Sequence, residues 1–182
     1  MEDLSLHILD IVENAIAAKA KKIDVSVREE LNEDRLVIEI ADDGIGMDEE
    51  VREKATDPFF TTRTSRKVGL GLSLMAQAAQ ESGGMLRIES EPGKGTKVTV
   101  TFQYSHIDRK PLGSMTETMA TLFLGNPELD ISYSHQKQGR TYTLSSHALK
   151  ERFKNRPLAG PEVIQWVKKH LKEGLAQIGV QG

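Results

Sequence analysis

Glycine is concentrated in one stretch of this sequence. Eight of the 15 glycines lie between Gly44 and Gly95, where short β-branched runs alternate with segments of helical periodicity. Glycine allows tight turns and lets other groups approach the backbone closely. The pattern therefore indicates strands and helices joined by tight loops, and we expect the function to reside in this interval.

Helices and hairpins alternate before residue 104. Apolar residues at helical spacing predict an amphipathic helix from Asp3 to Ala20. Alternating β-branched residues predict antiparallel hairpins over 23–40 and 85–102, and helices are predicted to begin at Asp48 and to span 70–82. Helices interleaved with antiparallel pairs predict an α+β fold, a two-layer sandwich of helices on a mixed, mostly antiparallel sheet.

The sequence pattern changes after Tyr104. A polar, proline-terminated stretch divides the chain into residues 1–104 and a C-terminal α+β extension, 105–182. In the extension we predict a helix near 114–124, a hairpin over 130–144 and a final helix near 161–178.

The final helix needs a partner surface for its apolar stripe. An isolated helix of this length is marginal in water, so the stripe must be buried against something. We expect burial within a compact chain or at a homodimer contact made by residues 105–182, and the sequence leaves the choice open. The stripe comprises Val163, Val167, Leu171, Leu175 and Ile178.

Composition excludes several classes of chemistry and partner. The chain carries 24 Lys and Arg against 27 Asp and Glu, so no basic field attracts nucleic acid or an acidic membrane surface. The absence of cysteine excludes disulfides, thiolate zinc sites, iron–sulfur clusters and a cysteine nucleophile. With no signal-peptide pattern and no long apolar run, we expect a cytoplasmic protein without membrane or nucleic-acid partners.

The first helix carries polar residues on one narrow face. With His7 set to zero, Asp10 lies at about 300° and Asn14 at about 340°, whereas Glu13 points elsewhere. An Asn carbonyl oxygen suits Mg²⁺, and Asp10, one turn earlier, could polarise a water beside that metal. For this helix alone, a solvated polar stripe is the simpler interpretation.

One glycine pair follows two carboxylates, and a second pair stands at the start of a predicted helix. The strand over residues 38–40 runs into Asp42 and Asp43, followed by Gly44 and Gly46. A buried aspartate at a strand end can accept a hydrogen bond from an exocyclic amine, and glycines let backbone approach a flat ring. Taken alone, Asp-Asp-Gly is also an ordinary turn.

The second pair, Gly69 and Gly71, stands at the start of a predicted helix. The free N–H groups and the dipole of a helix start favour phosphate there, although a lone Gly-x-Gly is equally typical of a flexible loop.

Four segments taken together resemble, in order, the N, G1, F and G2 boxes of the GHKL superfamily of gyrase, heat-shock chaperone, histidine-kinase and MutL-type ATPases. They are Asp10–Ala15, Asp42–Met47, Asp57–Thr62 and Gly69–Leu72.

The resemblance covers about residues 1–104, and the turn over residues 90–96 is similar to that of the sensor histidine-kinase branch. It implies a histidine-kinase-like ATP-binding domain in which Asn14 coordinates Mg²⁺ and Asp42 binds the adenine amine. It also implies nucleotide contacts from Gly44, Gly46, Met47, Phe60, Thr62, Arg63, Lys67, Gly69, Leu70, Gly71, Leu72 and Thr96.

Some of these implied roles have simpler alternatives. Phe59 and Phe60 would anchor the lid between the F and G2 boxes, but aromatic pairs are more often part of a core. Arg63 and Lys67 would reach phosphate oxygens, but could equally belong to a solvated charge cluster.

Two departures from the sensor kinases bear on function. Only six residues precede His7 in this sequence, so the resemblance implies a stand-alone domain without the dimerisation helices, and we do not expect self-phosphorylation in the usual arrangement. Asp10 occupies a position that is usually Asn in sensor kinases and a carboxylate, acting as general base, in the hydrolases and serine kinases. We therefore expect either a kinase acting on a separate acceptor protein, or a nucleotide-gated module or ATP hydrolase that controls a partner.

Overall fold

A single six-stranded sheet organises the chain. The computed structural model describes residues 3–57, 59, 70–154 and 156–181. Within them the strand order is β3-β4-β2-β1-β5-β6, and only β1 and β5 run parallel among neighbouring strands. The strands are β1 (Lys22–Glu30), β2 (Arg35–Asp42), β3 (Met85–Glu91), β4 (Gly95–Gln103), β5 (Asp130–Lys137) and β6 (Arg140–Ser145).

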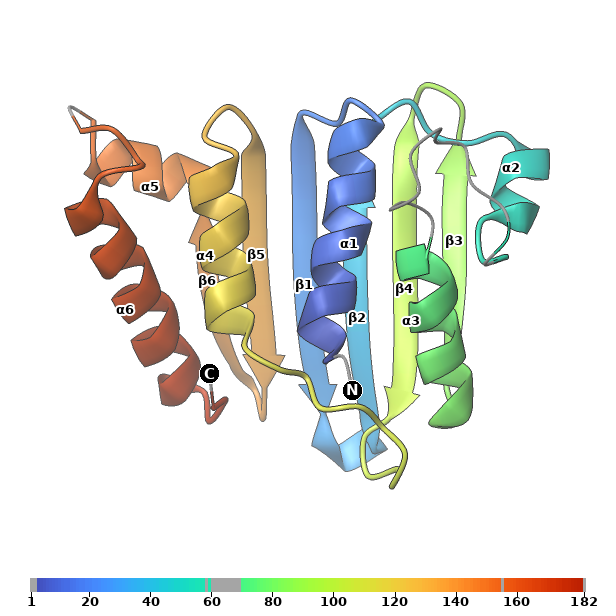
Figure 1. Cartoon of the computed structure of the whole chain (residues 1–182). Coiled ribbons are helices and arrows are strands. Elements are labelled where there is room, and N and C mark those ends of the chain that lie inside the picture. Colours follow the sequence, from blue (N-terminus) through green and yellow to red (C-terminus); the bar gives the residue numbers. More distant parts are fainter. Residues whose placement is uncertain (1–2, 58, 60–69, 155, 182) are drawn as a thin grey trace.

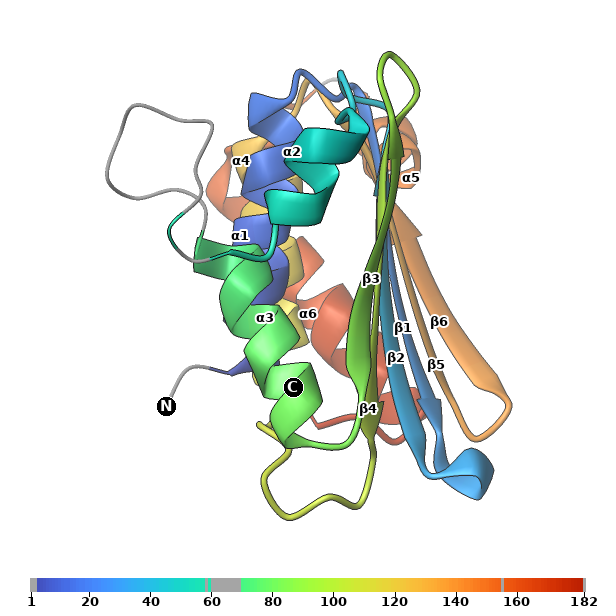
Figure 2. The same ribbon diagram turned by 90° about the vertical axis from the view of Figure 1, so that its right-hand side faces the viewer.

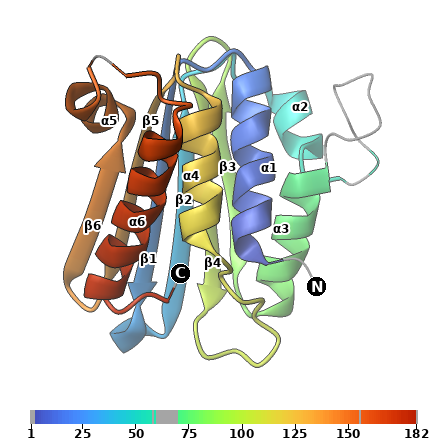
Figure 3. The same cartoon turned by 60° about the vertical axis from the view of Figure 1, so that its left-hand side comes forward.

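The long helices lie side by side over one face of this sheet (Figures 1 and 2). Figure 3 shows α6, α4, α1 and α3 in that spatial order, each running along the strands. The two-layer α+β fold predicted from the sequence is therefore confirmed. The helices are α1 (Leu4–Ala17), α2 (Glu49–Lys54), α3 (Leu70–Glu81), α4 (Met115–Gly125), α5 (Ser146–Arg152) and α6 (Pro161–Gln177), with a 3₁₀ turn at Leu31–Glu33.

Alternation along the strands explains why only one face is covered. On β1, Ile23, Val25 and Val27 are buried under the helices, while the residues between them face the open side. The open side is polar: Glu39 on β2 forms ion pairs with Arg28 and, at 2.7 Å, with Lys97. A sheet with one apolar and one charged face needs a single layer of helices. None of the helices in the described part of the chain is long and apolar enough to span a membrane.

Helix α1 begins and ends at backbone contacts. The N–H groups of Leu4 and Ser5 donate to the carbonyls of Pro111 and Leu112 at 3.0 and 2.8 Å, which satisfies two N-terminal donors without a side-chain cap. The helix ends at Ala17, earlier than the predicted Ala20, and the following Lys19 adopts a φ of 64°.

Residues 105–182 contribute to the same sheet and the same hydrophobic core as residues 1–104. Strand β5 pairs with β1 over eight residue pairs, from Lys22 opposite Asp130 to Glu29 opposite Lys137. The apolar stripe of α6 is covered within the chain, since its members are at most 5% exposed. They are Val163, Val167, Leu171, Leu175 and Ile178.

A buried contact between Glu29 and His135 joins β1 to β5. His135 is fully buried, with Nε2 2.7 Å from Oε1 of Glu29 and Nδ1 2.7 Å from the hydroxyl of Tyr133. Burial acts to raise the pKa of Glu29, but hydrogen bonds from His135 and Tyr104, together with the charges of His135 and Lys137, outweigh it and lower that pKa.

A glycine lies where α6 packs on β6. A Cβ at Gly174 would be 2.0 Å from the nearest ring atom of Tyr142, whose hydroxyl is 2.7 Å from Nδ1 of His170. We predict that Gly174→Ala lowers the free energy of unfolding by about 1–3 kcal/mol, because the held ring must move, despite the better helix propensity of alanine. Equilibrium urea denaturation measures this change.

Gly125, at the end of α4, provides the matched control. A Cβ there meets nothing within 4 Å. We expect Gly125→Ala to leave the free energy of unfolding unchanged or to raise it by up to about 1 kcal/mol. Equal effects of the two substitutions would contradict the steric explanation.

Candidate functional site

One face of α1 connects the two ends of the candidate site. At one end, the carbonyl of Ala18 accepts a hydrogen bond from the N–H of Ile45 at 2.8 Å. At the other, a Cβ on Gly71 would lie 2.7 Å from Cβ of Asp10, so the first turn of α3 packs directly on that residue. Asn14 is one helical turn from both, and Asp10 and Ala18 are about 12 Å apart along the axis.

The polar face predicted for α1 runs from the core outward. His7 is fully buried, whereas Asp10 and Asn14 are half-buried and Glu13 is exposed. Asp10 therefore lies, partly exposed, on the side of α1 that meets α3, and Asn14 lies one turn further along the same face of the helix.

Asp42 lies at the end of β2 on the helix-covered face of the sheet. Its Oδ1 accepts a hydrogen bond from the N–H of Gly44 at 2.8 Å. Burial raises the pKa of Asp42, and the charge of Asp43 adds to this effect. Backbone hydrogen bonds from Gly44 and Thr96 oppose the rise but do not cancel it.

Asp43 faces the other way and has a structural role. Its Oδ1 accepts hydrogen bonds from the N–H groups of Lys21 and Lys22 at 2.7 and 2.9 Å, which fixes the start of β1. Hydrogen bonds from the backbones of Lys22 and Lys21 lower the pKa of Asp43. The adjacent carboxylates thus have opposite environments, a difference that the sequence did not reveal.

The loop after Asp42 packs backbone-to-backbone on the turn between β3 and β4. Gly46 has a φ of 69°, and a Cβ there would be 2.0 Å from the carbonyl oxygen of Glu91. The carbonyl of Ile45 accepts a hydrogen bond from the N–H of Gly93 at 2.7 Å. A side chain at residue 46 would separate the loop from the turn, so glycine is required there.

Ser90 joins this loop to the hairpin and was missed by the sequence analysis. Its buried hydroxyl accepts from the N–H of Met47 at 2.8 Å, donates to the carbonyl of Gly95 at 2.9 Å and lies 2.8 Å from Oγ1 of Thr96. One donor and two lone pairs account for all three contacts. The alternating pattern of the two predicted strands placed Ser90 and Thr96 near the turn on the inward face, and this pattern was the signal that could have indicated the contact.

The start of α3 is described only from Leu70 onward. Leu70 is 49% exposed, Gly71 is buried and Leu72 packs partly against the core. Phe59 is 95% exposed, so its interpretation as a core aromatic is wrong. The predicted lid and phosphate contacts Phe60, Thr62, Arg63, Lys67 and Gly69 lie outside the described residues.

The candidate site thus combines a carboxylate at a strand end, a glycine loop and a polar helix face on the helix-covered side of the sheet. Residues 2–106 match the family described as histidine kinase-, DNA gyrase B-, and HSP90-like ATPase. Because the match includes more than half of the chain, the chain belongs to this family.

Curated relatives include a sporulation kinase and a signal transduction histidine-protein kinase. The chain is 35% identical to sporulation kinase E of Bacillus subtilis (strain 168) over 94 residues, which are 51% of this chain and 13% of that protein. It is also 35% identical to the signal transduction histidine-protein kinase ArlS of Staphylococcus aureus (strain USA300) over 99 residues, 52% of this chain and 22% of that protein. The chain thus spans less than a quarter of the length of these two kinases.

Solved structures share the fold over a longer part of the chain. The N-terminal domain of a DNA repair protein superposes with a TM-score of 0.56 and 19% identity, covering 80% of this chain and 53% of that one. The MutL ATPase domain of Aquifex aeolicus, complexed with ADP, superposes with a TM-score of 0.50 and 22% identity. This match covers 84% of this chain and 67% of that one. Coverage of this size must include part of residues 107–182, so the likeness in fold extends beyond the family segment.

The Ser90 hydroxyl generates a prediction about the loop. Ser90→Ala leaves the N–H of Met47 and the carbonyl of Gly95 without this partner, and we expect the free energy of unfolding to fall by about 1–3 kcal/mol. Urea denaturation measures the loss, and faster amide hydrogen exchange at Met47 locates it. Ser134→Ala on the open face of β5 is the control, since its hydroxyl forms no hydrogen bond to the described residues. Unchanged exchange at Met47 would rule out the positioning role of Ser90.

Proposed function

We propose that the chain binds Mg²⁺–ATP between α1, the Gly44–Met47 loop and the start of α3, and transfers the γ-phosphoryl group to a separate acceptor protein. Family membership supports the ATP-binding part. The geometry also supports it, because α1 borders both ends of the proposed site: Asp10 packs on the start of α3, and the Ala18 carbonyl accepts from Ile45 in the glycine loop.

In this proposal the adenine lies at the β2 end of the site. The Asp42 carboxylate offers about four lone-pair directions, so it retains acceptor capacity beside its backbone hydrogen bonds. It would accept from the exocyclic amine of adenine, whereas guanine carries a carbonyl oxygen at the equivalent ring position. The Gly44, Gly46 and Met47 loop would form one wall of the base pocket, with Thr96 behind it.

The phosphate end would be formed by Asn14 and the start of α3. Mg²⁺ usually takes one or two protein oxygens together with substrate phosphates, and a half-buried Asn14 carbonyl fits this need. Across the described residues, no group of three or more His, Asp or Glu side chains is arranged to hold a metal ion. Bound Mg²⁺ would neutralise phosphate charge. Gly69 and Gly71 would contact the phosphates, and Arg63 and Lys67 from the lid would reach phosphate oxygens. Phe60 would anchor the lid, and Thr62, Leu70 and Leu72 would complete the nucleotide site.

The contact between Asp10 and Gly71 carries the catalytic part of the proposal. The start of α3 favours anions, and a carboxylate beside bound phosphate weakens ATP binding through like-charge repulsion. Such a residue is useful if it accepts the proton of the attacking hydroxyl while the new O–P bond forms and the bond to ADP breaks. Asp10 would serve as that base.

A second candidate function is favoured by the connection between α1 and the C-terminal part. The first turn of α1 bonds to Pro111 and Leu112, and β5 pairs with β1, so a movement of α1 on nucleotide binding would reach residues 105–182. The nucleotide state would then control a partner, with or without ATP hydrolysis.

Incubation of the purified chain with γ-labelled ATP and lysate proteins distinguishes these functions. Label on a foreign protein supports the kinase. Release of labelled phosphate alone supports the hydrolase, and nucleotide binding without either product supports the gated module.

The environment of Asp42 predicts base preference. We expect Asp42→Asn to weaken ATP binding by about tenfold to a hundredfold, the effect of losing a charge-assisted hydrogen bond, and to abolish the preference over GTP. Isothermal calorimetry measures both affinities. Asp43→Asn is the matched control, because its amide oxygen can still accept from Lys21 and Lys22. Equal affinities for ATP and GTP in the unmodified chain would rule out the assignment.

The raised pKa of Asp42 adds a dependence on pH. The hydrogen bond from the amine is charge-assisted only when the carboxylate is ionised, so the advantage of the unmodified chain over Asp42→Asn should be lost as pH falls through this pKa. Because burial raises the pKa, the loss should occur above the range of an ordinary aspartate. The ratio of the two affinities cancels titration of ATP itself.

Substitutions at Asp10 and Asn14 should affect turnover and nucleotide binding separately. We expect Asp10→Asn to retain ATP binding and to slow transfer or hydrolysis by about 10²–10⁴-fold. Asn14→Ala should lose Mg²⁺-dependent binding. Glu13→Gln, on the exposed side of α1, is the control and should leave both unchanged. Calorimetry with and without Mg²⁺ and release of label measure these effects, and normal turnover by Asp10→Asn would exclude the base.

A further inference from the structure

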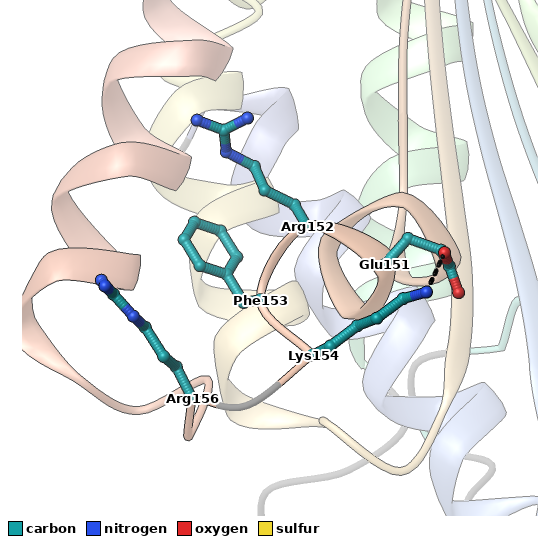
Figure 4. Close-up of a pocket in the computed structure, with 5 residues that line it drawn as sticks. All are labelled: Glu151, Arg152, Phe153, Lys154 and Arg156. Atoms are coloured by element: carbon teal, nitrogen blue, oxygen red, sulfur yellow. Dashed lines mark ion pairs between the residues drawn. The ribbon is translucent and has the colours of Figure 1, made fainter.

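A pocket lies between the end of α5 and the start of α6, on the part of the chain beyond the family segment (Figure 4). Its volume is about 530 Å³, and we call it the α5–α6 pocket. Figure 4 shows the side chains of Arg152, Phe153 and Arg156 on the side toward α6, while the Lys154–Glu151 ion pair lies on the other side of the pocket.

The cations of the pocket differ in how they are compensated. Lys154 lies 3.0 Å from Glu151, and Arg156 forms an ion pair with Glu162. Arg152 is exposed, and within the described ranges no carboxylate approaches it to ion-pair distance. Its guanidinium retains donors that can form charge-assisted hydrogen bonds to an anion.

An aromatic surface holds this guanidinium in place. Its carbon is 4.5 Å from the ring centre of Trp166 and 5.7 Å from that of Phe153. The two rings pack edge to face at 5.4 Å, and Trp166 stacks on His170 at 4.5 Å. Because the guanidinium of Arg152 already lies against packed rings, it loses less rotational freedom on binding a ligand.

The charge of this region is opposite to that of the chain. Residues 146–156 contain Glu151 as their only acid, whereas the chain as a whole has a net charge of −3. An acidic partner is therefore repelled by most of the protein and attracted here. The cations of this segment are Lys150, Arg152, Lys154 and Arg156.

We propose that the α5–α6 pocket binds an acidic segment of a partner protein, with a carboxylate on Arg152 and an adjacent apolar side chain on Phe153. A protein segment fits better than a nucleic acid, because Trp166 is already stacked on His170 and covered by Arg152, and so offers no free ring for a base. The acidic remainder of the chain would also repel a long polyanion. The proposal does not rest on nucleotide chemistry.

Fluorescence anisotropy of the full chain with a labelled peptide of Asp, Glu and Leu residues tests this site. We expect saturable binding that weakens with salt, and little binding of the same peptide with Asn and Gln in place of the acids. Arg152→Gln should weaken binding at least about tenfold, and Arg156→Gln should also weaken it. Lys172→Gln removes the same charge from an exposed position further along α6 and should change affinity less than about twofold.

Several outcomes would overturn the proposal. These are no binding of the acidic peptide, equal binding of the neutral peptide, equal losses in Lys172→Gln and Arg152→Gln, or tighter Arg152-dependent binding of a single-stranded thymidine oligonucleotide. Unchanged ATP affinity and unfolding midpoint in Arg152→Gln would show that the variant is folded and that its nucleotide site is intact. A failure here would therefore leave the proposed ATP function unaffected.

Discussion

The packing of α1 on the sheet determines where the functional groups of this protein lie. Ile8 and Val12 are fully buried in the core, and this fixes the rotation of the helix about its axis. With that rotation set, Asp10 and Asn14 can lie only at the margin toward α3, while Ala18 meets the loop after β2. The hydrophobic stripe therefore positions both ends of the candidate site. A cavity under α1 would disturb the site through helix orientation as well as through stability.

The parallel pairing of β1 with β5 makes the C-terminal part continuous with that site. Strand β1 lies at the centre of the sheet and has antiparallel β2 on one side and β5 on the other. The buried contact between Glu29 and His135 spans this junction, and the Tyr104 hydroxyl and Lys137 contact the other oxygen of the same carboxylate. Removing His135 would leave Oε1 of Glu29 without its buried hydrogen-bond partner. The structural likeness to the MutL ATPase domain, which exceeds the family segment, is consistent with such an enlarged sheet.

Sequence reasoning succeeded where the structure depends on local periodicity. The hairpins and the amphipathic helices follow from spacings of about two and 3.6 residues, which short windows contain. The place of β5 beside β1 could not be predicted, because strand pairing across a hundred residues leaves no local pattern. Ser90 was missed for a related reason: a hydroxyl in a strand becomes informative only when its cross-strand neighbours are known. The separate environments of Asp42 and Asp43 likewise depend on which face of the sheet each one meets.

The environment of Asp42 disfavours its ionised carboxylate in the protein without ligand. This cost suggests that Asp42 has a role in binding. Glu29 and Glu39 are also at least partly buried, but side-chain hydrogen bonds and neighbouring positive charges lower the pKa of each. Asp42 has backbone donors and a neighbouring acid instead, and burial raises its pKa. Between the ordinary and the raised pKa the folded chain binds more protons than the unfolded chain, so the contribution of Asp42 to stability falls as pH rises through that range. Under the proposed function, a carboxylate that weakens the fold at neutral pH, at the end of a buried strand and beside a glycine loop, would gain its missing donor from the ligand. The exocyclic amine of adenine is such a donor.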